Sequence, residues 1–89
     1  MITALFRFYR NLNDFLPISR RDVSFSATMA MNASIKDAIE SLGIPHTEVE
    51  AVIVNGLPVG FSYRMQSGDS AAVYPDLDVP GNASLPPLS

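Results

Sequence analysis

His46, the single histidine, is the side chain in this sequence best suited to acid–base or metal chemistry. A general base must reach the proton that it removes, and a metal site needs several ligands. The nearest acids along the chain, Glu48 and Glu50, do not supply such a site on a domain of this size. We therefore interpret His46 as a loop or capping residue.

Two carboxylates, Asp37 and Glu40, stand three positions apart in a segment with helical periodicity. Paired catalytic carboxylates need separated pKa values and a cleft that holds the substrate. Together with Lys36, this pair is more typical of a solvated helix face. We interpret it in that way.

Cysteine and glycine usage excludes further kinds of site. The chain has no cysteine, which excludes a disulfide scaffold, a thiolate zinc site and a cysteine nucleophile. Gly56, Gly60 and Gly68 are dispersed, so they predict turns and not a phosphate-binding loop. We therefore predict a protein that is not an enzyme and that uses no cofactor, metal or small-molecule substrate.

Length and composition predict one small folded domain. The 89 residues are 47% hydrophobic, which is enough to supply a core. The opening residues lack a basic start and Arg7 interrupts their apolar run, so they do not indicate a signal peptide. No apolar stretch approaches the roughly eighteen residues that a membrane span needs. The sequence thus predicts a soluble protein, most simply located in the cytoplasm.

Charge is unevenly distributed along the chain, whose formal net charge is −3. Basic residues outnumber acidic ones in the first 22 positions, which contain Arg7, Arg10, Arg20 and Arg21. An acidic chain is poorly suited to strong non-specific nucleic-acid binding. RNA contact through these arginines is therefore a disfavoured alternative.

The first third of the sequence predicts two strands separated by a long loop. Alternation over residues 2–9 places Ile2, Ala4, Phe6 and Phe8 on one face, which we assign to the core. Residues 10–22 are rich in turn formers, and we expect a loop with at most one helical turn, pinned to the core by Phe15. Residues 23–27 alternate again, with Val23 and Phe25 pointing inward.

One amphipathic helix is predicted to begin after Ser34. Ser34 and Asp37 have the spacing of a capping box. The core-facing stripe has the i, i+3, i+4, i+7 spacing and consists of Ile35, Ala38, Ile39 and Leu42. Gly43 and Pro45 end the helix, and residues 47–50 predict one further short turn.

The second half of the sequence predicts a hairpin and a final strand. Residues 51–54 are predicted to form a strand rich in β-branched residues. Asn55-Gly56 favours a type I′ turn, and residues 57–60 form the second arm of the hairpin. Residues 61–65 are compatible with a strand or an irregular segment. Residues 67–69 turn, and residues 70–74 form the last strand, ended by Pro75. We predict a domain over residues 1–75 and a flexible Pro-rich tail or truncated inter-domain linker over residues 76–89.

This element order predicts an α+β fold of the β-grasp (ubiquitin-like) type, with a mixed four- to five-stranded sheet packed on one main helix. The helix covers one face of the sheet. Alternation places apolar, aromatic and basic side chains together on the opposite face, namely Leu5, Arg7, Tyr9, Ile53 and Tyr74. Such a mixture is typical of the centre of a protein interface, whereas scattered exposed apolar residues are also common.

Five short motifs in order give the sequence a family resemblance. They are Phe6-Arg-Phe-Tyr, Leu12-Asn-Asp-Phe-Leu-Pro17, Leu42-Gly-Ile-Pro-His-Thr-Glu-Val49, Val54-Asn-Gly56 and Val73-Tyr-Pro75. Residues 4–75 thereby resemble the bacterial ubiquitin-like domain that precedes the Mut-seven C-terminal ribonuclease domain, a PIN-like nuclease. The late half also resembles, more distantly, the sulfur-carrier and ubiquitin-like proteins.

The resemblance implies an accessory domain, with the nuclease chemistry lying in a separate domain. No nuclease sequence follows Pro75, so we expect a free-standing relative or a fragment of a longer nuclease. Sulfur carriers of this fold end in Gly-Gly, whereas Leu85-Pro-Pro-Leu-Ser89 stands here and Gly81 is the nearest glycine.

Three functional classes follow from these patterns. We favour a protein-binding accessory module whose partner is a PIN-like nuclease domain, in cis or in trans, or a second copy of the chain. A sulfur-carrier or protein-modifier role is the second class, and the absent Gly-Gly counts against it. An RNA-contacting module is the third, and strong salt-dependent RNA binding would favour it.

Overall fold

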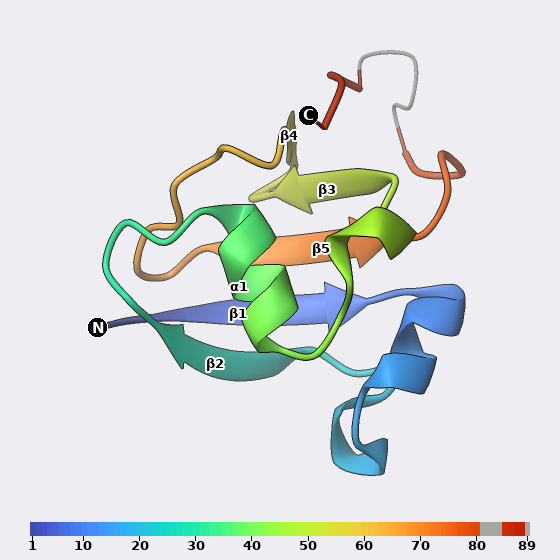
Figure 1. The fold of residues 1–89 in the computed structure, drawn as a ribbon, viewed down its shortest axis with the longest axis horizontal. Helices are drawn as coiled ribbons and strands as arrows, with labels where there is room; N and C mark the ends of the chain where they lie inside the picture. Colours follow the sequence, from blue (N-terminus) through green and yellow to red (C-terminus); the bar gives the residue numbers. More distant parts are fainter. Residues whose placement is uncertain (81–84, 89) are drawn as a thin grey trace.

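Strands from the two ends of the described chain lie side by side at the centre of the sheet. The structure is a computed structural model, and it describes residues 1–80 and 85–88. β1 (Ile2–Phe8) pairs in parallel with β5 (Ser70–Tyr74), and Phe6 stands opposite Ala71. Figure 1 shows these two strands at the middle of the sheet, with α1 (Ile35–Ser41) lying across one face.

The remaining strands extend the sheet outward on both sides. β2 (Phe25–Met29) pairs antiparallel with β1, and β3 (Ala51–Val54) pairs antiparallel with β5. β4 (Leu57–Val59) pairs with β3 through the hairpin, which gives the order β2-β1-β5-β3-β4. Over the described residues this mixed five-stranded sheet with one α-helix confirms the predicted α+β, β-grasp architecture.

The helix begins and ends as its sequence predicts. The Ser34 hydroxyl accepts a hydrogen bond from the Asp37 amide at 3.1 Å, which caps the first turn. Ile35, Ala38 and Ile39 are buried, and Leu42 is partly buried against the same core. Gly43 follows with φ +93°, a left-handed conformation that side chains disfavour and that ends the helix.

The core between α1 and the sheet is centred on three phenylalanine rings. Phe6, Phe8 and Phe25 stack with centroids 6.0–6.4 Å apart, and Phe6 and Phe8 are fully buried. Val52, Val54 and Val73 bring the strands on the other side into the same cluster. The prediction that Ile2, Ala4, Phe6 and Phe8 face the core is therefore confirmed.

The loop over residues 10–22 differs from its prediction. It contains two 3₁₀ helices, Arg10–Phe15 and Ile18–Arg20, and Leu12 and Leu16 are the apolar residues that it buries. The prediction that Phe15 pins the loop was wrong, because its side chain remains 42% exposed. The 3₁₀ helix ends at Phe15, and Leu16, whose backbone is extended, is the residue that enters the core there.

Asn13 organises this loop from inside. Its side-chain amide donates to the Phe8 and Arg10 carbonyl oxygens at 2.9 and 3.0 Å, and its Oδ1 accepts from the Asp22 amide at 2.8 Å. The Asn13 side chain is buried, at 5% exposure. Asn13 therefore stabilises both ends of the loop, a role that the sequence pattern did not reveal.

Val23 is the second correction. It was predicted to point inward with Phe25, yet its side chain is 44% exposed, and β2 starts only at Phe25. Continuation of the ladder would place Val23 opposite Phe8, whose carbonyl accepts the Asn13 amide instead. Asp22 also has φ +57°, which turns the chain before the strand can begin.

The hairpin between β3 and β4 has the predicted turn. Asn55 and Gly56 have φ values of +52° and +82°, as a type I′ turn requires. Residues 61–65 are irregular apart from one bridge, between Ser34 and Arg64. Met65 in this segment is buried in the core.

Asp69 fixes the hairpin to the start of β5. Its carboxylate accepts from the Asn55 amide at 2.8 Å, the Tyr63 hydroxyl at 2.7 Å and the Gln66 backbone N–H at 2.8 Å. Burial raises the pKa of Asp69, but these hydrogen bonds together hold it below its ordinary value. The hydrogen bond that the Tyr63 hydroxyl donates to Asp69 raises the pKa of Tyr63. The sequence predicted only a turn here.

Candidate functional site

The five residues predicted to share the open face of the sheet do lie on one side of it. Arg7 stands opposite Ala72, and Ala72 stands opposite Ile53, so these three form one row across β1, β5 and β3. Leu5 lies two residues before Arg7 and is 45% exposed. Ile53 and Ala72 are partly buried, because both pack against a cluster of Ala51, Tyr74 and Val79.

Tyr9 and Tyr74 close one end of this face. Their rings stack with centroids 4.4 Å apart and planes 11° from parallel. Burial raises the pKa of the Tyr74 hydroxyl, and its hydrogen bond with Tyr9 raises it further. Tyr74 is only 8% exposed, so it supports the surface and contributes little contact area itself.

The segment that follows β5 explains why Tyr74 is buried. Val79, itself 8% exposed, packs with Tyr74 and Ala51 in a second apolar cluster, which Leu85 also contacts. Residues 76–89 were predicted as a flexible tail, and part of that range, 81–84 and 89, lies outside the described residues. In the described part, the chain returns over the tyrosine end of the open face.

Arg10 holds this returning segment through its acidic residues. Its guanidinium lies 3.6 Å from an Asp76 carboxylate oxygen and 3.1 Å from an Asp78 carboxylate oxygen. It also donates to the Asp78 carbonyl at 3.2 Å. Because these side chains are largely exposed, each pair contributes only modestly to stability.

Arg7 is the arginine at the centre of the open face. Its guanidinium carbon lies 5.1 Å from the centroid of the Tyr9 ring, a cation–π contact. Its Nε is enclosed and has no hydrogen-bond partner among the described residues. No carboxylate of residues 1–80 or 85–88 forms an ion pair with it.

Of the four arginines considered above for RNA contact, the three other than Arg7 are engaged within the molecule. Arg10 binds the acidic segment after β5. Arg20 lies over the Phe25 ring at 4.7 Å, and Arg21 Nε donates to the Leu16 carbonyl at 2.9 Å. They support the 10–22 loop and its neighbours and do not form one free basic patch.

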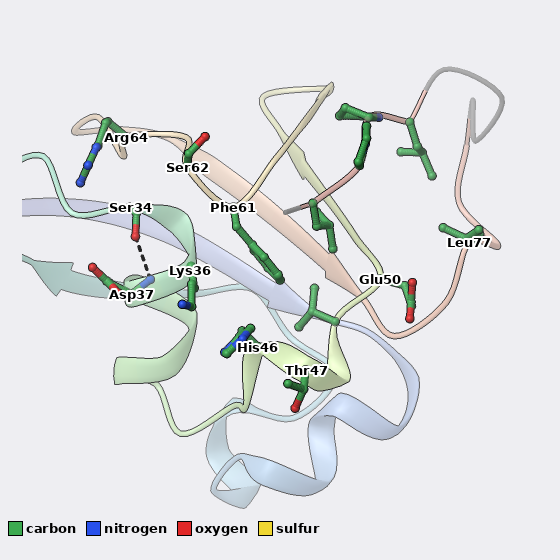
Figure 2. Close-up of a pocket in the computed structure, with 15 residues that line it drawn as sticks. Ser34, Lys36, Asp37, His46, Thr47, Glu50, Phe61, Ser62, Arg64 and Leu77 are labelled. Carbon is green, nitrogen blue, oxygen red and sulfur yellow. Dashed lines mark hydrogen bonds between the residues drawn. The ribbon is translucent and has the colours of Figure 1, made fainter.

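A separate groove of about 1090 Å³ lies on the helix side of the molecule and was not predicted (Figure 2). Its lining includes Phe61, His46 and Thr47 together with residues 85–88. The Phe61 amide donates to the Leu88 carbonyl at 2.8 Å, which connects the 85–88 segment to the chain after β4. These lining residues are distant in sequence, so no local pattern signalled the groove.

His46 has a structural partner at the edge of this groove. Its Nδ1 pairs with the Glu40 carboxylate, and its ring meets Phe61 edge-on with centroids 5.6 Å apart. The hydrogen bond from His46 lowers the pKa of Glu40. The pair joins α1 to the 3₁₀ turn His46–Glu48, consistent with the interpretation of His46 as a loop residue.

Two further properties bear on the kind of site. Within residues 1–80 and 85–88, no group of three or more histidine, aspartate or glutamate side chains is arranged to hold a metal ion. The described residues also contain no helix long and apolar enough to cross a membrane.

A mixed sheet in this order, with one helix on one face, defines the ubiquitin-like class of β-grasp domains. Within that class, the chain belongs to the Mut7-C ubiquitin family, which matches residues 1–79. The match covers β1 to β5 and α1, and it extends to Val79, which packs against Tyr74.

Solved structures with low sequence identity share this fold. The chain is similar to small archaeal modifier protein 1 of Haloferax volcanii, with a TM-score of 0.64, 14% identity, and coverage of 84% of this chain and 98% of that one. It is also similar to a putative molybdopterin converting factor subunit 1 of Pyrococcus furiosus, with a TM-score of 0.63, 17% identity and coverage of 84% and 98%. No curated protein matches the sequence significantly.

Proposed function

We propose that this chain is a non-catalytic accessory domain that binds a protein partner through the open sheet face. The partner that the family resemblance implies is a PIN-like ribonuclease domain, in cis or in trans. Family membership supports the accessory role, because the resemblance assigns the nuclease chemistry to a separate domain.

The observation that carries the proposal is the row of Arg7, Ala72 and Ile53 beside exposed Leu5. The opposite face is consumed by α1 and the core, so it offers no comparable apolar area. An apolar centre with an arginine is the composition of energetically important interface residues. A single-domain interface of this size is expected to be modest, near the low end of about 1,200 Å².

The test is an NMR titration of the labelled chain with a Mut-seven-type nuclease domain. Chemical-shift changes clustered at residues 3–9, 51–54 and 70–74 are the expected result. A dilution series of the chain alone reports self-association through the same face. Changes confined to the 10–22 loop, or seen only when RNA is added, would contradict the proposal.

A protein-modifier role is the second candidate, and the shared fold with the archaeal modifier protein is what favours it. A modifier must present the segment after its last strand to an activating enzyme. Here the corresponding segment lies against Tyr74 and Arg10, which disfavours that presentation. Gly81 and Ser89, on which the sequence-based expectation depends, lie outside the described residues.

Intact-mass analysis separates the two functions. Incubation of the chain with a cognate activating enzyme and ATP is expected to leave its mass unchanged. A mass shift corresponding to a C-terminal thiocarboxylate, or an adduct formed through the C-terminus, would support the modifier role.

A further inference from the structure

We propose that Arg7 is a carboxylate-binding residue, so that the open face recognises an aspartate or glutamate side chain that the partner presents among apolar side chains. The inference rests on the proposed function of this face and specifies the chemistry of its partner. Three observations support it, namely the position of Arg7, its missing counter-charge and the way its side chain is held.

The position of Arg7 places a cation within an apolar surface. Across the sheet it stands opposite Ala72, which is partly buried against the cluster of Ala51, Tyr74 and Val79. Leu5, which is 45% exposed, precedes it in β1, Tyr9 follows just after the end of β1, and partly buried Ile53 ends the row. A partner that covers these side chains must also remove water from the guanidinium.

The charge of Arg7 is not neutralised within the described part of the chain. Arg10 pairs with Asp76 and Asp78, whereas Arg7 has no carboxylate of residues 1–80 or 85–88 within ion-pair distance. Covering an unpaired charge is strongly unfavourable, because the ion loses its hydration without gaining a partner. A partner that covers Arg7 therefore needs an anionic group directly above it.

The side chain is held in a way that suits one planar anion. Nε is enclosed by its surroundings, and the guanidinium lies over the Tyr9 ring. The Nη atoms form no hydrogen bond within the described residues and are not enclosed as Nε is. They can donate two parallel hydrogen bonds to the two oxygens of a carboxylate. Because the stem is already ordered, binding loses less side-chain entropy.

A carboxylate fits these observations better than the phosphates of RNA. Binding to RNA depends on many simultaneous phosphate contacts and on counterion release. Arg10, Arg20 and Arg21 are engaged within the molecule, so Arg7 would act alone. One arginine among Leu5, Ala72 and Ile53 matches a single acidic side chain surrounded by apolar ones.

The experiment compares three variants of the full chain in titrations with the nuclease domain. Arg7→Gln is expected to weaken binding about ten- to hundred-fold, as loss of a charged hydrogen bond does. Arg7→Lys, which keeps the charge but not the paired donors, is expected to fall in between. Arg64→Gln is the matched control, because it removes the same charge from a residue that donates to the Asn32 carbonyl instead.

Leu5→Ala distinguishes failure of this inference from failure of the proposed function. If Leu5→Ala weakens binding and Arg7→Gln does not, the face is the interface but the carboxylate inference is wrong. If neither change weakens binding, the proposed function of the face is wrong as well. If Arg7→Gln weakens binding to a uridine-rich RNA more than binding to the nuclease domain, the phosphate alternative replaces the inference.

A pair of peptides tests the inference without the nuclease domain. N-acetyl-Leu-Glu-Leu-amide at millimolar concentration is expected to shift the Arg7 Nε–H resonance, whereas the matched Leu-Gln-Leu peptide is not. Equal shifts from both peptides, or a shift from neither, would overturn the proposal.

Discussion

The two faces of the sheet use neighbouring residues of one strand for opposite purposes. Phe6 is fully buried under α1, while Leu5, the residue before it, is 45% exposed on the other side. The helix face is filled by stacked rings and aliphatic side chains. The open face has Arg7, which pairs with no carboxylate of the described residues, and a tyrosine pair covered at one end by Val79. The comparison teaches that stability and recognition can be changed separately in this domain.

The largest effect is expected on the helix face. Ile39→Ala removes a side chain with 0% exposure and is expected to lower the free energy of unfolding by about 2–5 kcal/mol. Urea or thermal unfolding followed by circular dichroism measures this loss. A melting temperature close to that of the unchanged chain would show that the helix face contributes no more to stability than the open face.

Asp69 comes next, because it links the hairpin to β5 at the edge of both faces. Asp69→Ala leaves the Asn55, Tyr63 and Gln66 donors without their acceptor and is expected to cost about 1–3 kcal/mol. Unfolding curves measure the loss. Tyr63→Phe, which removes a single donor and its hydrogen bond, is the milder comparison.

The pH dependence of this contact follows from the lowered pKa of Asp69. A carboxyl whose folded pKa lies below its unfolded value stabilises the fold at pH values above the ordinary value of 3.8. That stability is lost as the pH falls through the folded pKa. Acid unfolding of Asp69→Asn should therefore show a smaller pH dependence below about pH 4 than the unchanged chain.

A smaller effect is expected where the segment after β5 crosses the open face. Arg10→Gln removes two exposed ion pairs and is expected to change stability by about 0–1 kcal/mol. Amide exchange at residues 76–79 should nevertheless become faster, because the segment loses its anchor. Unchanged exchange would mean that Val79 alone holds the segment in place.

The smallest effect on stability is expected at the centre of the open face. Leu5→Ala is expected to change the free energy of unfolding by about 0.5 kcal/mol or less, as exposed substitutions usually do. Its effect should appear in partner binding instead. A stability loss comparable to that of Ile39→Ala would show that the two faces are not separable.

Local patterns predicted the parts of the fold that local physics determines. The Ser34 cap, the left-handed Gly43 and the Asn55-Gly56 turn each depend on residues adjacent in the chain. Alternation assigned β1 to its two faces correctly, because a strand buried on one side leaves the period-two pattern in its sequence.

Long-range contacts account for what the sequence did not show. Val23 and Phe15 were misassigned because the Asn13 hydrogen bonds to Phe8 and Asp22 set the path of the loop. The return of Val79 over Tyr74 and the pairing of His46 with Glu40 likewise join segments that no periodicity connects. The sequence therefore predicted which residues lie on the open face, but it did not predict that Val79 covers part of that face.

The parallel pairing of β1 with β5 has a consequence for how the domain folds. β1 pairs with β2 on one side and with β5 on the other. The pairing at the centre of the sheet therefore cannot form until the residues of β5 are available. Bringing β1 and β5 together closes the long segment of chain between them, which costs conformational entropy before any contact compensates for it. Folding is therefore expected to be slower than that of helical bundles of similar size, whose contacts are mostly local. During synthesis, β1 therefore lacks its β5 partner until residue 74 has left the ribosome. Until then, only β2 and α1 are available to cover Phe6 and Phe8.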